Sequence, residues 1–152
     1  MKNKFFKKVP QTFYTVASLS ALAAINYSII HNPLVFIFIL VLLAHELGHY
    51  FIAKKHKALV SLPIFLPLPF FAIGITKVKN LFSSKAKKDV AIAGPIVGAA
   101  TAFLLLCLNI LFNFTSNLPI LFLFFGELVF NYFGSDGARY RQAKRTDALC
   151  TF

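Results

Sequence analysis

The stretch that decides the fold is LVFIFILVLLAHELGHYFIA, which runs from Leu34 to Ala53. A helix of about 20 apolar residues spans the hydrocarbon core of a bilayer, and this stretch has that length. Its second half nevertheless contains three ionisable residues, His45, Glu46 and His49. Such residues are costly inside a membrane helix, so their presence favours a functional role over a chance pattern.

The spacing of these three residues predicts a metal site. His45 and His49 are four positions apart, so on a helix they share one face about one turn apart. Both imidazoles can then bind one tetrahedral zinc ion, and Glu46 can act as general base toward a water on the same metal. We therefore expect one zinc ion (Zn2+) per chain.

The composition is typical of a membrane protein with a single domain. Hydrophobic residues make up 58% of the 152 residues, and the mean hydropathy is +0.72. The net charge of +11 would also suit a nucleic-acid-binding protein, but the Lys and Arg residues form short clusters between apolar runs. We therefore expect the lipid bilayer, and no nucleic acid, as a partner. Cys107 and Cys150 are expected to be free thiols.

The apolar runs predict an all-α membrane protein, with one integral-membrane domain over residues 1–152. Four transmembrane helices are expected at about residues 13–30, 34–53, 90–114 and 118–133. The third of these contains Gly94, Gly98 and Ala102, each four positions from the next. Such a stripe of small residues allows a neighbouring helix to approach closely.

The positive charges predict how the helices are oriented. All 16 Lys and Arg residues lie in the N-terminal segment, between residues 54 and 88, or in the C-terminal tail, and the loops 31–33 and 113–117 have none. Four crossings with both termini cytoplasmic place every basic residue on one side of a bacterial or archaeal cell membrane. A cleaved signal peptide is the alternative for the first run, because residues 21–23 resemble a cleavage site.

Residues 59–79 are almost wholly apolar but cannot form a helix, because Pro63, Pro67 and Pro69 fall close together. We expect a short extended or re-entrant membrane segment between the second and third helices. Alternation over residues 71–78 predicts a short strand. An extended peptide could pair with this strand as an added strand. If that peptide were a substrate, Gly74 and Ile75 would be substrate-binding residues. The alternative is a plug or an interfacial loop without a substrate role.

Two histidines leave a zinc ion short of a third protein ligand, and the sequence offers three candidates. His56 follows the second helix among lysines, and we interpret it as part of a solvated basic cluster. Glu127 lies within a membrane helix and must face the bundle interior or a partner. Asp136 lies between Gly134 and Gly137, where the backbone can turn its carboxylate back into the bundle, and it matches the histidines in depth better than Glu127 does.

Several motifs together resemble the site-2 protease family of intramembrane zinc metalloproteases, in particular the minimal core of archaeal and chloroplast members. They are HELGH from His45, AGPIVG from Ala93, DGAR from Asp136, and the PIFLPLP and GITK segments between the first two. Order and spacing agree over residues 34–140. The resemblance implies a metalloprotease domain in which His45, His49 and Asp136 bind zinc and Glu46 is the catalytic base.

The chain departs from the family pattern in two places. The last motif usually contains Asn, then Pro, then Leu-Asp-Gly, whereas here Asn131 precedes Asp136 by a shorter stretch without proline. The resemblance still makes Asn131 a candidate for binding substrate. The third-helix motif often ends in Asn, where this chain has Gly98.

The leading hypothesis is an intramembrane zinc endopeptidase that cleaves transmembrane segments of other membrane proteins or peptides, in regulated intramembrane proteolysis or peptide maturation. The alternative is a non-proteolytic membrane protein that keeps the site for metal binding or, as a pseudo-enzyme, for substrate binding. Glu46 argues against this alternative, because metal binding alone does not need its carboxylate. A third possibility keeps the enzyme but makes Glu127 the third ligand.

Overall fold

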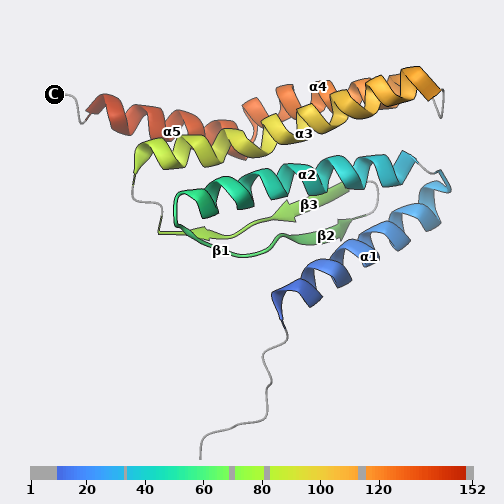
Figure 1. Ribbon diagram of the computed structural model, residues 1–152, viewed down its shortest axis with the longest axis horizontal. Helices are drawn as coiled ribbons and strands as arrows, with labels where there is room; N and C mark the ends of the chain where they lie inside the picture. Colours follow the sequence, from blue (N-terminus) through green and yellow to red (C-terminus); the bar gives the residue numbers. More distant parts are fainter. Residues whose placement is uncertain (1–9, 33, 69–70, 81–82, 113–115, 150–152) are drawn as a thin grey trace, which may run out of the picture.

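The computed structural model describes residues 10–32, 34–68, 71–80, 83–112 and 116–149 (Figure 1). Helices make up most of them, with four short strands between the second and third helices. The elements are α1 (Gln11–Ile30), α2 (Leu34–Lys55), β1 (Leu59–Val60), β2 (Ile64–Leu68), β3 (Phe71–Ile75), β4 (Val78–Lys79), α3 (Ser84–Phe112), α4 (Asn117–Phe133) and α5 (Ser135–Leu149).

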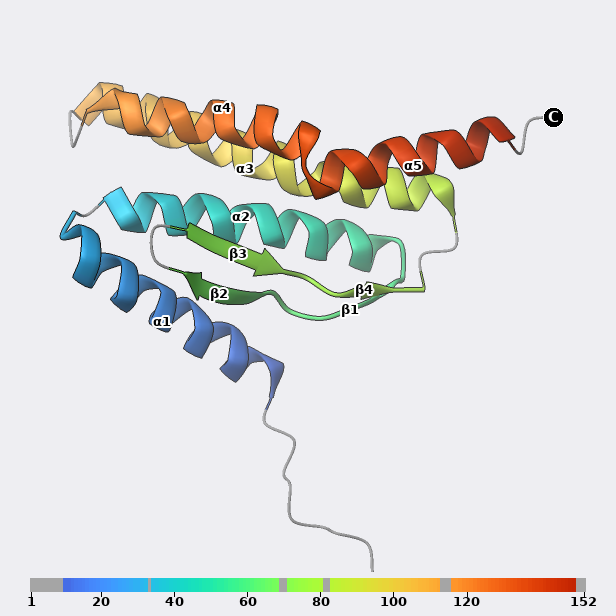
Figure 2. The same cartoon turned by 180° about the vertical axis from the view of Figure 1, so that it is seen from behind.

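The elements are stacked in layers around α2. One side of α2 packs on α3, which in turn packs on α4 and α5, and the β2–β3 hairpin lies under the other side of α2 (Figures 1 and 2). Helix α1 crosses the far side of the hairpin at an angle and contacts β2. Helix α2 is therefore the central element, with helices on one side and strands on the other.

Among the described residues, two helices are long and apolar enough to cross a membrane, namely α2 with 22 residues and α3 with 29. They support a membrane location and the mostly helical class that the sequence predicts. Helix α4 has a shorter apolar stretch, Asn117–Val129. That α1 and α4 also cross the membrane, which would make four transmembrane helices, stays a prediction.

Two helix boundaries differ from the predicted ones. Helix α3 begins at Ser84, six residues before the expected start, because the basic segment ahead of the apolar run is already helical. The segment after residue 133 was expected to be a tail, but only Gly134 interrupts the helix and α5 continues to Leu149. Hydropathy does not reveal α5, because its helical residues are polar and charged.

The segment with three prolines is extended, as expected, and forms two antiparallel pairs of strands. In the β2–β3 hairpin Phe65 lies opposite Gly74 and Ile64 lies opposite Ile75. The β1–β4 pair matches Val60 with Val78. The strand expected at 71–78 is thus divided into β3 and β4, so the chain is not purely α-helical.

Helix α1 is held against the hairpin by polar and apolar contacts. Phe65 is buried together with Leu22 of α1 and with Val35 and Ile39 of α2. The backbone N–H of Phe65 donates a hydrogen bond to Ser18 Oγ at 3.1 Å. A sheet edge with unpaired N–H groups invites unwanted pairing, and α1 covers this edge of β2.

We expect cysteines introduced at Lys57 and Lys85 to be shielded from a membrane-impermeant thiol reagent in intact cells, and cysteines at Asn32 and Ser116 to react with it. The reason is that basic segments stay on the cytoplasmic side during insertion. Labelling before and after permeabilisation measures the difference.

The variants are made in a chain without Cys107 and Cys150, so that each has a single thiol. Labelling of the Lys85 variant in intact cells would contradict the four-crossing topology.

Candidate metal centre

Helix α2 places His45 and His49 one turn apart on its buried side. Their Nε2 atoms lie 3.2 Å apart, and the rings meet edge to face with centroids 4.9 Å apart. The exposed fractions of His45 and His49 are only 6% and 7%. The two rings therefore converge in a site that bulk water barely reaches.

Asp136 reaches the same point from the first turn of α5. Its Oδ2 atom lies 3.4 Å from His45 Nε2 and 3.3 Å from His49 Nε2. Its other oxygen, Oδ1, lies 3.5 Å from Arg139 Nη1. Burial alone would raise the pKa of Asp136, but the contacts with His45 and His49 lower that pKa below its ordinary value. One oxygen of the Asp136 carboxylate therefore faces both histidine rings.

The second nitrogen of each histidine has its own hydrogen-bond partner. His49 Nδ1–H donates to the backbone carbonyl oxygen of Val90 in α3 at 2.7 Å. His45 Nδ1–H donates to Glu127 Oε2 in α4, also at 2.7 Å. With the ring protons held at Nδ1, both Nε2 atoms present lone pairs to the same point, as in metal-binding histidines with outer partners.

The three residues fit a zinc ion by their chemistry. His45, His49 and Asp136 each offer one ligand atom, and these atoms all lie within 4.8 Å of one another. Two imidazole nitrogens and one carboxylate oxygen form a donor set that suits zinc and leaves a fourth position open. Two facing nitrogen lone pairs and a buried carboxylate also need a cation to balance them.

Glu46 lies on the same helix but is held by the strand segment. The Thr76 hydroxyl donates a hydrogen bond to Glu46 Oε2 at 2.6 Å. Gly74, at the end of β3, lies so close to Glu46 that a Cβ atom at position 74 would overlap the Glu46 side chain. Residues 74 and 76 therefore fix the position of the carboxylate.

Glycines also allow α2 and α3 to meet closely at the site. A Cβ atom on Gly48 would lie 2.6 Å from the carbonyl oxygen of Ala93, and a Cβ atom on Gly94 would overlap the ring of His49. Gly94, Gly98 and Ala102 are all buried. The predicted stripe of small residues thus lies where α3 meets the histidine helix and α4.

The other candidate residues whose side chains the structure describes lie outside the ligand cluster. Glu127 contacts His45 from the Nδ1 side, away from Asp136. His56 Nε2 lies 3.0 Å from Asp89 Oδ2, so this histidine, expected to be merely solvated, has an acidic partner. Ile75 is partly exposed beside Gly74. Asn131 lies in α4, but its side chain is outside the described residues.

Three contacts at the site were not predicted from the sequence: Thr76 with Glu46, Val90 with His49, and Glu127 with His45. Thr76 follows Gly74 by two positions, so alternation along a strand would have placed both residues on one face. The sequence indicated that the Glu127 carboxylate needs a partner, but it did not indicate that this partner is Nδ1 of His45. A backbone carbonyl such as that of Val90 leaves no signal in a sequence.

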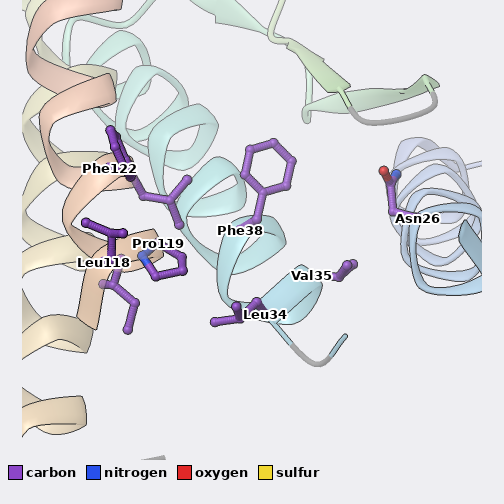
Figure 3. Close-up of a pocket in the computed structure, with 9 residues that line it drawn as sticks. Asn26, Leu34, Val35, Phe38, Leu118, Pro119 and Phe122 are labelled. Atoms are coloured by element: carbon purple, nitrogen blue, oxygen red, sulfur yellow. The ribbon is translucent and has the colours of Figure 1, made fainter. Parts of the chain in front are cut away.

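An apolar cavity of about 500 Å³ lies between α1, α2 and α4, at the other end of α2 (Figure 3). Phe38 lines it from α2 and Leu123 from α4, while Asn26 contributes a polar side chain from α1. Phe38 precedes His45 by seven positions and Leu123 precedes Glu127 by four, so each pair shares a helix face. The cavity therefore lies along the same helix faces as the candidate metal centre.

The chain resembles two curated plant proteins over about half of its length. The protein from Arabidopsis thaliana, named probable zinc metalloprotease EGY1, chloroplastic, is 38% identical over 71 residues, which are 45% of this chain and 13% of that protein. The protein of the same name from Oryza sativa subsp. japonica is 34% identical over 76 residues, 47% of this chain and 13% of that protein.

This chain therefore matches only about an eighth of the length of these relatives. No family model and no solved structure matches it. The relatives are named zinc metalloproteases, and the order of the motifs along this chain agrees with that name. Together these findings support the site-2 protease family of intramembrane zinc metalloproteases as the family of this chain.

Proposed function

We propose that this chain is an intramembrane zinc endopeptidase that cleaves membrane-spanning segments of other proteins or peptides. The observation that carries the proposal is the convergence of His45 Nε2, His49 Nε2 and Asp136 Oδ2 within 4.8 Å, with Glu46 next to one of the histidines. A buried cluster of this kind in an apolar helix suits hydrolysis away from bulk water.

His45, His49 and Asp136 would hold the zinc ion, which would supply a Lewis acid for the scissile carbonyl and for the attacking water. Glu46 accepts a proton as this water adds to the carbonyl carbon. The same proton then goes to the amine as the peptide C–N bond breaks. The hydrogen bond from Thr76 supports this role, because it fixes one oxygen of the Glu46 carboxylate.

A helical substrate must unwind locally, since its carbonyl groups are engaged in i to i−4 hydrogen bonds. We propose that the unwound part pairs with β3, so that Gly74 and Ile75 contact substrate. The contact of Gly74 with Glu46 supports this placement, since it sets β3 directly beside the general base. The cavity of Figure 3 offers apolar surface to the part of the substrate that remains in the membrane.

The non-proteolytic alternative is not favoured, because the relatives are named proteases and Glu46 is held in place beside the cluster. We also propose that the chain is a multi-pass protein of a bacterial or archaeal cell membrane with both termini on the cytoplasmic side. The clustering of basic residues supports this orientation.

Zinc content and activity should separate in the variants of the centre. Purified chain in detergent should hold about one zinc ion, and His45→Ala, His49→Ala or Asp136→Asn should remove it. Glu46→Gln should retain zinc and lower the cleavage rate by about 10²–10⁴-fold, because only proton transfer is lost. Metal analysis and cleavage of a membrane-spanning reporter measure the two effects.

His56→Ala is the matched control, because His56 is a histidine near the end of the same helix that contacts Asp89 instead of the cluster. It should keep both zinc and activity. Loss of zinc in Glu46→Gln, or full zinc content in Asp136→Asn, would contradict the assigned roles.

Gly74→Ala should slow cleavage without releasing zinc. The added methyl group overlaps Glu46 and shifts the carboxylate, and a misplacement of about 1 Å typically costs about 100-fold in rate. Leu66→Ala in the paired strand is the control, since Leu66 is exposed. Equal cleavage rates in the two variants would show that β3 does not position Glu46.

A further inference from the structure

Within the described part of the chain, Glu127 is the partner of the metal-centre histidines that comes from a side chain of the apolar helix α4. Its Oε2 atom lies 2.7 Å from His45 Nδ1, and the exposed fractions of the two side chains are 14% and 8%. The opposite nitrogen of the same ring, Nε2, lies 3.4 Å from Asp136 Oδ2. The imidazole of His45 is thus held between a carboxylate on α4 and the ligand cluster.

We propose that Glu127 is a positioning residue that fixes the tautomer and orientation of His45, and that Gly98 provides the space in which it does so. This inference rests on the proposed function, since it concerns the same metal centre.

The chemistry of imidazole explains why a partner at Nδ1 matters. A neutral imidazole has one N–H, and the nitrogen without it is the one that binds a metal. A carboxylate at Nδ1 holds the proton there, keeps the Nε2 lone pair free, and makes that lone pair more basic. Glu127 therefore favours the form of His45 that binds zinc.

The two histidines differ in how this partner is supplied. His49 donates to the carbonyl oxygen of Val90, which belongs to the backbone of α3 and is present whatever the side chain. His45 lies one turn farther into the apolar helix and depends on a side chain of α4. Its orientation is therefore sensitive to substitution in a way that the orientation of His49 is not.

Gly98 provides an independent observation on the same contact. A Cβ atom at position 98 would lie 2.7 Å from Glu127 Oε2, the oxygen that accepts the hydrogen bond from His45. Gly98 is buried where α3 meets α4. A side chain at this position would push the carboxylate of Glu127 away from His45. The hydrogen bond between Glu127 and His45 therefore requires a glycine at position 98.

The test measures zinc affinity by chelator competition on the full chain in detergent, with cobalt absorption as a report on the ligand set. Glu127→Ala should weaken affinity by about 10–100-fold, the usual cost of losing an outer partner, while saturating zinc still gives about one ion. Glu127→Gln should weaken it less, because the amide oxygen still accepts a hydrogen bond. The cobalt spectrum should keep its parental form in both variants.

Leu128→Ala is the matched control, since Leu128 is the next residue of α4 and is exposed. It should bind zinc as the parent does. An unchanged affinity in Glu127→Ala overturns the proposal. If that variant fails to fold, the Gln variant decides, and parental affinity there overturns it. Loss of zinc at saturation with an altered cobalt spectrum also overturns it, because Glu127 would then be a ligand.

A double-mutant cycle tests the part of Gly98. Gly98→Ala should weaken zinc affinity in the parent but should have no further effect in the Glu127→Ala chain, because the contact that it disturbs is already gone. Losses that simply add would overturn the link between the two residues. A parent chain that holds no zinc contradicts the proposed function itself, which separates that failure from the failure of this inference.

Discussion

A polar side chain that is buried away from water must have a partner, and α2 carries three such side chains in the middle of an apolar sequence. Segments packed around α2 supply a partner for each of them. Val90 of α3 holds His49, Glu127 of α4 holds His45, and Thr76, just after β3, holds Glu46. The arrangement of helices and strands around α2 can be understood as the means of satisfying these groups.

The close approach of these elements depends on small residues. Gly48, Gly94 and Gly74 each lie where an added Cβ atom would collide with a neighbouring backbone or with a side chain of the centre. Packing in membranes gains little from hydrophobicity and much from close contact, so such positions tolerate little added volume. The geometry of the centre therefore depends as much on side chains that are absent as on those that bind.

Some of this was predictable from the sequence and some was not. The length and spacing of residues 34–53 predict the helix and the shared face of His45 and His49, and the motifs led to the family that the relatives support. The polar helix α5 was missed because hydropathy measures membrane affinity and not helix formation. The packing of α1 on the hairpin and the partner of Glu127 depend on contacts between distant segments, which no local pattern encodes. The roles of the ligands and of Asn131 stay predictions.

The junction at Gly134 has a mechanical consequence. Asp136 belongs to the first turn of a helix that extends through polar residues to Leu149. Because α5 also packs on α3 and α4, a displacement of this helix would shift the carboxylate at its base relative to the histidines of α2. An affinity tag or fluorescent domain fused behind α5 would act on the helix that holds Asp136, whereas a fusion ahead of α1 would act on a helix outside the cluster of His45, His49 and Asp136.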